Sequence, residues 1–147
     1  RAPCVLTQAM AAQKLAAEPD ARGEPQATGL IINMVDQRVR KLTPEFMTYT
    51  MSKMGLWALT QTMAQALAPN IRVNGIAPGP TMIGHRQTET HFANQRKNTI
   101  LQRGSNPDEI CDTLEFILDS NGMTGQLICL DGGQHLAWKT PDIRGIE

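Results

Sequence analysis

A tyrosine and a lysine four residues apart are the side chains of this sequence with the clearest chemical use. In the segment Tyr49-Thr-Met-Ser-Lys53, the two side chains would share one face of a helix, with Cβ atoms about 5–6 Å apart. A free phenol has a pKa of about 10, and a nearby ammonium lowers that value because it favours the phenolate. Such a pair can give and take a proton near neutral pH. The same spacing is also common between unrelated surface residues, so the pair needs support from its surroundings.

An aspartate thirteen residues before the tyrosine gives that support. Asp36 follows residues 30–35, a short apolar run typical of a strand buried on both faces of a parallel sheet. In open α/β sheets, ligands bind beyond the carboxyl ends of the strands, which is where Asp36 stands. A carboxylate there would favour a protonated, iminium-like nitrogen and would help to keep the Tyr49 phenol protonated. The alternative role for Asp36 is to cap a turn, as many aspartates after a strand do.

Helices and strands alternate along the chain and would position these residues. We expect helices over residues 2–17, from 44 or 45 to 68, over 89–97 and over 106–118, strands over 29–35, 71–77 and 125–130, and a surface loop over 18–28. Such alternation predicts an α/β fold in which parallel strands are joined by right-handed crossovers. Three strands make a narrow sheet, since such sheets usually carry about five or six. We therefore expect further strands to lie outside this sequence.

The chain as a whole resembles the C-terminal part of a short-chain dehydrogenase/reductase. The segments that carry the resemblance are Gly29-Leu-Ile-Ile-Asn33, Tyr49-Thr-Met-Ser-Lys53, Leu59-Thr60, Leu67-Ala-Pro-Asn-Ile-Arg-Val-Asn74, Ala77-Pro-Gly79, and Thr124-Gly-Gln126 with Asp131-Gly-Gly133. The resemblance implies a partial Rossmann-like, doubly wound parallel sheet made of three C-terminal strands and their crossover helices. Residues 1–136 would be the C-terminal part of that domain, and residues 137–147 would form a tail.

The resemblance also implies roles for individual residues. Tyr49 would be the catalytic acid/base, and Lys53 would bind the nicotinamide ribose and depress the pKa of the phenol. Asp36 stands where the family usually has serine, and this substitution resembles the branch of pteridine and dihydromonapterin reductases. We therefore include Asp36 among the catalytic residues. The residues implied beside the nicotinamide are Pro78, Gly79, Pro80 and Thr81.

These implications predict an NAD(P)H-dependent reductase that acts on a small pteridine-like or other C=N-containing molecule. The cofactor would be NADP or NAD, with NADP slightly preferred. An ordinary carbonyl reductase or alcohol dehydrogenase of the same family is one alternative. A non-catalytic oligomerising fragment is another, because the twelve glycines form no GxxxGxG phosphate loop. We expect the complete protein to be an enzyme, whereas the activity of these 147 residues alone stays open.

Composition narrows the partners and the cellular location. Fourteen basic residues balance fourteen acidic ones, so the chain lacks the positive surplus that nucleic-acid binding needs. No apolar run reaches the roughly 18 residues of a membrane helix. The three cysteines form no CxxC pair, and His85 and His91 belong to no HExxH motif. We therefore expect a cytoplasmic protein with no metal site.

A stripe of apolar residues runs along the long helix at helical spacing. It consists of Met51, Met54, Trp57 and Ala58. Such a stripe indicates either core packing or a subunit interface. Because the family usually dimerises through this helix, we expect self-association, as a dimer or tetramer, through residues 49–68.

Overall fold

A parallel sheet of three strands forms the centre of the computed structural model, which describes residues 1–85 and 87–140. The strands are β3 (Gly29–Met34), β4 (Ile71–Pro78) and β5 (Leu127–Leu130), in the order β3–β4–β5. The central strand, β4, pairs in parallel with both neighbours. This arrangement confirms the α/β class and the three parallel strands expected from the alternating pattern.

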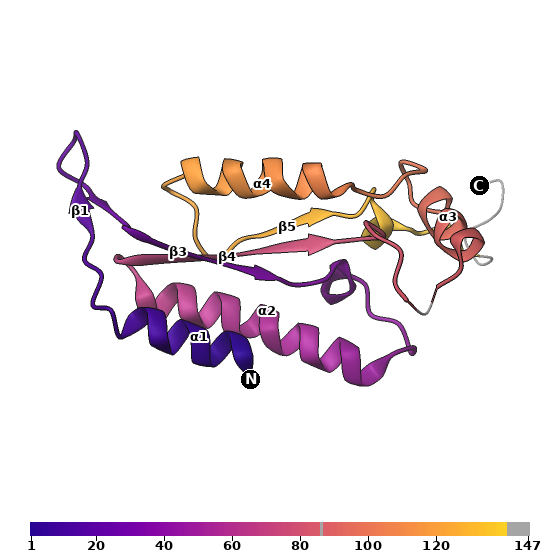
Figure 1. Ribbon diagram of the computed structural model, residues 1–147, viewed down its shortest axis with the longest axis horizontal. Helices are drawn as coiled ribbons and strands as arrows, with labels where there is room; N and C mark the ends of the chain where they lie inside the picture. Colours follow the sequence, from indigo (N-terminus) through magenta and orange to yellow (C-terminus); the bar gives the residue numbers. More distant parts are fainter. Residues whose placement is uncertain (86, 141–147) are drawn as a thin grey trace, which may run out of the picture.

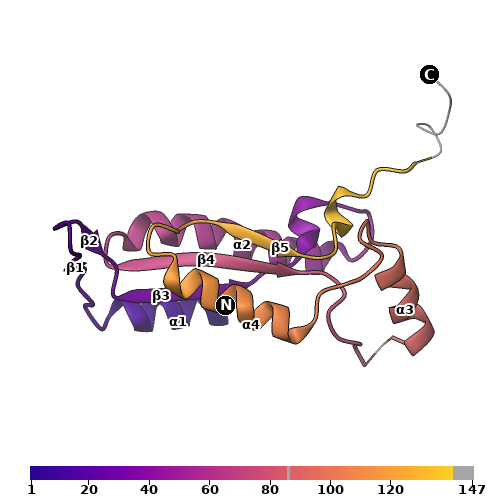
Figure 2. The ribbon, with the colours of Figure 1, turned by 90° about the horizontal axis from the view of Figure 1, so that it is seen from above.

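Helices cover both faces of this sheet and make a three-layered molecule (Figure 1). The helices α1 (Ala2–Ala11) and α2 (Met47–Leu67) lie on one face, and α4 (Pro107–Asp119) lies on the other. The view from above shows the three strands running side by side (Figure 2). Because β4 is covered from both sides, every residue from Ile71 to Ala77 is buried.

The two faces of β4 are packed differently. Ile71 and Val73 point toward α2 and pack against Ala64. On the opposite face, Arg72 reaches the end of α4, where its guanidinium donates hydrogen bonds to the carbonyls of Leu118, Ser120 and Met123 at 3.0–3.1 Å. The last carbonyls of a helix have no partner within the helix and carry partial negative charge, so a guanidinium stabilises them.

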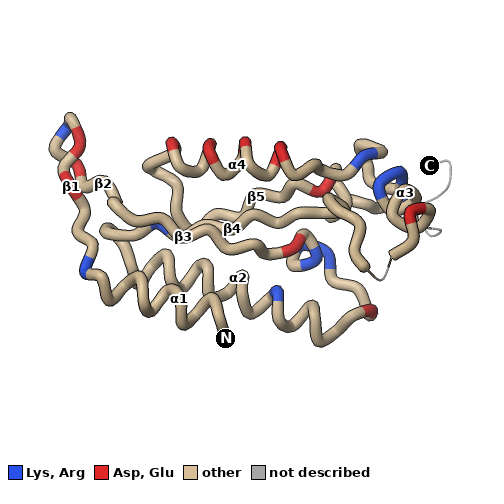
Figure 3. Tube along the Cα trace, viewed as in Figure 1, with Lys and Arg blue, Asp and Glu red and all other residues tan. Residues whose placement is uncertain are grey.

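Most of the acidic residues of α4 face solvent. Figure 3 shows them spaced along the outward side of this helix. Ile117, in contrast, points inward and is completely buried. Glu109 in the first turn accepts a hydrogen bond from the backbone N–H of Asn106 at 2.7 Å, which helps to fix the start of the helix.

The carboxyl end of the sheet is surrounded by short elements. These are η1 (Gln37–Arg40) after β3, α3 (Glu89–Lys97) after β4, and η2 (Gln134–Leu136) after β5. All three lie at the end toward which the strand arrows point in Figure 1. This end of the sheet is where the sequence placed the candidate site.

Several boundaries differ from the sequence expectation, and the backbone explains most of them. The first helix ends at Ala11 instead of residue 17, and Lys14 just beyond it has φ of 55°. The long helix begins at Met47 instead of residue 44 or 45, because Phe46 adopts the left-handed conformation. Strand β5 starts two residues later than expected because Gly125 has φ of 68°, which an extended strand cannot hold.

The loop expected over residues 18–28 contains a small antiparallel pair of strands. Its strands are β1 (Glu18–Pro19) and β2 (Pro25–Gln26). Asp20 closes the turn, because its Oδ1 accepts hydrogen bonds from the backbone N–H groups of Arg22 and Glu24 at 2.7 and 2.9 Å. The helix expected over residues 89–97 has the predicted bounds.

The end of the chain was expected to form a tail from residue 137. Residues 137–140 belong to no helix or strand, and residues 141–147 lie outside the described part. Among the described helices, none combines the length and the apolar character needed to cross a bilayer. The described residues also include no group of three His, Cys, Asp or Glu side chains placed to hold a metal ion.

Candidate active site

The two carboxylate oxygens of Asp36 have different partners. Asp36 directly follows the buried Val35 and is the N-cap of η1. Its Oδ1 accepts a hydrogen bond from the backbone N–H of Arg38 at 2.7 Å, and its Oδ2 accepts one from the Tyr49 hydroxyl, also at 2.7 Å. Asp36 therefore caps a turn and contacts the phenol at the same time. The two roles weighed for this residue do not exclude each other.

Partial burial and this contact together keep the Tyr49 phenol protonated. Partial burial raises the pKa of Tyr49 above its ordinary value, and the hydrogen bond and negative charge of Asp36 raise it further. The positive charge of Arg38 acts in the opposite direction but does not prevail. A phenol in this environment can donate a proton to a substrate at neutral pH, whereas it is a poor base in the absence of a ligand.

Lys53 does not have the effect on Tyr49 that the resemblance implied. Its ammonium donates a hydrogen bond to the carbonyl of Met34 at 2.9 Å, and its Nζ lies 5.7 Å from the centre of the Tyr49 ring. The net shift in the pKa of Tyr49 is upward, and Lys53 is not among its causes. Burial is the largest cause of the upward shift. The Asp36 carboxylate, which contacts the phenol oxygen directly, adds to it, whereas the ammonium is held at the end of β3.

The loop after β4 comes close to the loop after β5. The backbone N–H of Gly79 donates to the carbonyl of Leu130 at 2.9 Å, and a Cβ on Gly79 would come within 2.7 Å of the Asp131 Cα. Only glycine allows this approach without moving the backbone. Thr81 turns away toward Ser105, since their hydroxyl oxygens are 2.6 Å apart.

A cavity of ≈ 340 Å³ lies between these elements at the carboxyl end of the sheet. It brings together several of the expected site residues, because Asp36, Tyr49 and the loop from Pro78 to Pro80 all line it. Thr81 and Lys53 are not among its lining residues. Lys53 instead lines a groove between α1 and α2.

Most of the remaining lining residues are polar, and the glutamines among them were not singled out in the sequence. These remaining residues are Gln37, Arg38, Met82, Gln87, Gln95 and Gln134. The four glutamines come from three parts of the chain, namely η1, α3 with the residues before it, and η2. No motif or spacing joins them, so the folded arrangement is the signal that identifies them as one group.

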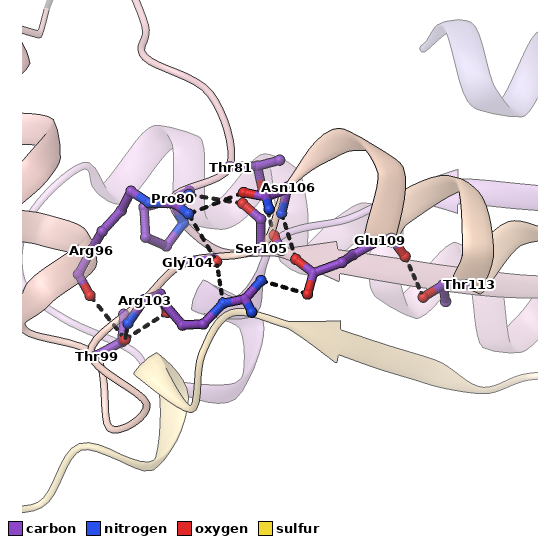
Figure 4. Close-up of polar contacts among 10 residues, drawn as sticks. All are labelled: Pro80, Thr81, Arg96, Thr99, Arg103, Gly104, Ser105, Asn106, Glu109 and Thr113. Carbon is purple, nitrogen blue, oxygen red and sulfur yellow. Dashed lines mark hydrogen bonds and ion pairs between the residues drawn. The ribbon is translucent and has the colours of Figure 1, made fainter.

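Arg96 fixes the wall of the cavity that follows β4 (Figure 4). Its guanidinium donates hydrogen bonds to the carbonyls of Pro80, Ser105 and Gly104 at 2.7, 2.8 and 3.1 Å, and to Asn106 Oδ1 at 3.1 Å. The same contacts hold α3 against the start of α4. The loop that carries Pro80 is therefore tied to two helices.

This arrangement agrees with comparisons of the whole sequence. A family model described as enoyl-(acyl carrier protein) reductase, a short-chain dehydrogenase/reductase group, matches residues 6–135. The chain belongs to the short-chain dehydrogenase/reductase family. The match covers most of the chain and includes β3, β4, β5 and the cavity between them.

Individual members of the short-chain dehydrogenase/reductase family are similar to this chain in sequence and in structure. Dihydromonapterin reductase of Escherichia coli K12 is 29% identical over 115 residues, which are 78% of this chain and 48% of that protein. The crystal structure of FolM alternative dihydrofolate reductase 1 from Brucella suis in complex with NADP is 50% identical, with a TM-score of 0.77, over 83% of this chain and 50% of that one. Its counterpart from Brucella canis, also solved with NADP, has the same identity and TM-score.

These similarities confirm the resemblance drawn from the sequence, including its link to dihydromonapterin reductase. They also confirm the Rossmann-like fold class. The chain spans about half the length of the curated relatives and solved structures that it matches.

Proposed function

We propose that the protein containing this chain is an NADPH-dependent reductase of a pteridine-like or other C=N-containing substrate. The observation that carries the proposal is the hydrogen bond of 2.7 Å between the Tyr49 hydroxyl and Asp36. It joins a proton donor to a carboxylate, and both residues line the cavity. The relatives fit this proposal, because they include a dihydromonapterin reductase and two alternative dihydrofolate reductases solved with NADP.

The pair suits reduction of a C=N bond better than reduction of a C=O bond. Reduction of a carbonyl builds negative charge on oxygen, which a neighbouring carboxylate disfavours. Reduction of C=N passes through a protonated, iminium-like nitrogen, which the Asp36 carboxylate favours by attraction of opposite charges. The Tyr49 phenol gives the proton to that nitrogen, and because its side chain is 44% exposed, solvent can restore the proton afterwards.

The described residues fit the nicotinamide end of the cofactor. The loop from Pro78 to Pro80 lines the same cavity as Tyr49 and could lie against the ring. In this proposal Lys53 holds the adjoining ribose, and Thr81 lies at the edge of the loop. When bound, the reduced nicotinamide supplies the hydride. The pyrophosphate needs a glycine-rich turn, and residues 1–147 contain no GxxxGxG sequence.

The proposal is tested by Asp36→Ser in the full-length gene product that contains these residues. With NADPH as cofactor, the rate of dihydropterin reduction should fall about a hundredfold to a thousandfold, which is the usual cost of one well-placed electrostatic group. Reduction of a simple ketone should be affected far less. Tyr49→Phe should depress both reactions, because both use the same proton donor.

Equal losses on both substrates for Asp36→Ser would assign this residue to turn capping alone. A ketone that is reduced faster than the dihydropterin by the unmodified protein would favour an ordinary carbonyl reductase instead. Circular dichroism of each variant shows whether the fold is retained.

A further inference from the structure

Glutamine amides form the largest polar group in the cavity beside Asp36 and Tyr49. Four glutamines line the cavity, and hydrogen bonds within the protein hold two of their side chains in place. Gln87 Nε2 donates a hydrogen bond to Gln95 Oε1 at 3.0 Å, and Gln87 Oε1 accepts one from the backbone N–H of Gly84 at 3.0 Å. These two amides therefore support each other across the start of α3, and the remaining two, Gln37 and Gln134, come from η1 and η2.

Gln37 carries a hydrogen-bond acceptor without a partner. Its side chain lines the cavity, yet the residue is only 8% exposed. Two buried side-chain oxygens have no hydrogen-bond partner in the part of the chain that the structure describes, and they belong to Gln37 and Thr50. Thr50 is not a lining residue of the cavity. Buried polar atoms are rarely left unpaired in folded proteins, so this oxygen calls for a partner that the described residues do not supply.

The charges around the cavity indicate what kind of ligand that is. The described lining residues include one carboxylate, Asp36, and one cation, Arg38, while the other polar side chains are neutral amides or the phenol. A phosphate or carboxylate ligand is normally met by several cations. Amides offer both donors and acceptors, which match a neutral, flat ring that carries N–H groups beside ring nitrogens and oxygens.

We propose that Gln37 orients the substrate by accepting a hydrogen bond from an N–H group of a pteridine-like ring. The inference rests on the proposed function and adds to it a residue that selects the substrate. The terminal torsion of glutamine is soft, so the amide can rotate its oxygen into the cavity when a donor arrives. Because Gln37 follows Asp36 directly in the chain, a ring held there lies beside the Asp36–Tyr49 pair.

The test compares Gln37→Met with Gln37→Glu in the full-length gene product. Methionine keeps the size of the side chain but removes the acceptor, whereas glutamate keeps acceptor oxygens. With a dihydropterin as probe, Gln37→Met should raise KM about tenfold, equivalent to about 1.4 kcal/mol of binding free energy. Gln37→Glu should stay within about threefold of the unmodified protein. The matched control is Gln13→Met, at an exposed position outside the cavity, which should leave KM unchanged.

Two further readouts separate binding from structural damage. The KM for NADPH should not change in Gln37→Met. Its Tm should be equal to or higher than that of the unmodified protein, because the substitution removes an unpaired buried oxygen. An unchanged dihydropterin KM, or a lower Tm with a parallel rise in both KM values, would overturn the assignment. If the unmodified protein reduces no dihydropterin, the proposed function itself is wrong. This result comes from the unmodified protein alone, so it is distinguished from a failure of the Gln37 assignment.

Discussion

At the scale of single residues, burial and the pairing with Asp36 together keep the Tyr49 phenol protonated. A tyrosine beside a lysine is expected to ionise more readily, but here the carboxylate contacts the hydroxyl and the ammonium contacts the Met34 carbonyl. The hydrogen bond needs the proton to stay on the phenol oxygen. A bound substrate that receives this proton would leave a phenolate beside Asp36, so the positive charge on the substrate and Arg38 must offset the repulsion.

The titration of Tyr49 tests this arrangement. Because the chain contains one tyrosine, the tyrosinate absorbance reports on this residue alone. Folding raises the pKa of Tyr49 above the ordinary value of 10.0. The unfolded chain therefore loses its proton first as the pH rises. The contribution of Tyr49 to stability is complete below about pH 10 and declines above it.

Asp36→Asn should lower the midpoint of the tyrosinate titration, because it removes the negative charge. The midpoint should stay above that of a free phenol, since burial is the largest cause of the shift. Arg38→Met should move the midpoint the other way, because Arg38 lowers the pKa of the phenol. Identical midpoints in all three proteins would show that neither charge acts on Tyr49.

At the scale of elements, the cavity depends on how the segment after β4 is tied to its neighbours. Arg96 on α3 reaches back to Pro80 and forward to the residues that precede α4. Gly104 is buried in this junction, where a Cβ would clash with the Pro80 carbonyl oxygen. Close backbone packing and one guanidinium thus hold the wall of the cavity.

Arg96→Met should lower the free energy of unfolding by about 2 kcal/mol, because hydrogen bonds to a charged group are lost and partly buried carbonyls are left unpaired. Urea denaturation measures the change. Lys97→Met is the matched control, since Lys97 is exposed and neighbours Arg96, and it should shift stability by less than about 0.5 kcal/mol. Equal shifts for the two variants would mean that Arg96 contributes nothing beyond an ordinary surface cation.

At the scale of the whole molecule, α2 exposes apolar side chains on the face away from the sheet. Met51 is 73% exposed and Met54 is 37% exposed. Ala58 is exposed as well. Trp57 is half-buried, and the centre of its ring lies 5.9 Å from the guanidinium carbon of Arg40. Exposed apolar stripes of this kind favour association, so self-association through this helix stays a prediction.

Met51→Glu should shift the mass in light scattering toward the monomer, because it places a charge within the predicted contact. Met51 is a sharper test than Trp57, where a carboxylate would meet the Arg40 guanidinium. Leu101→Glu serves as the control, because Leu101 is 68% exposed and lies outside α2. An unmodified protein that is monomeric at high micromolar concentration would contradict the prediction.

The sequence by itself determined the features that depend on near neighbours in the chain. Apolar runs predicted β3 and β4, and the sequence also predicted the helices α2 and α3. The position of Asp36 after a buried strand predicted that it lies at the carboxyl end of the sheet. Helical spacing placed Tyr49 and Lys53 on one helix. These features follow from periodicity and turn chemistry, which act over a few residues.

The tertiary structure decided which side chains meet. It gave Lys53 the Met34 carbonyl as a partner and turned Thr81 toward Ser105. It also brought glutamines from η1, the α3 region and η2 around one cavity. It also set the left-handed conformation of Phe46, which starts α2 later than its sequence indicates. The reason is that a loop takes the conformation that its neighbours allow, and those neighbours are far away in the sequence.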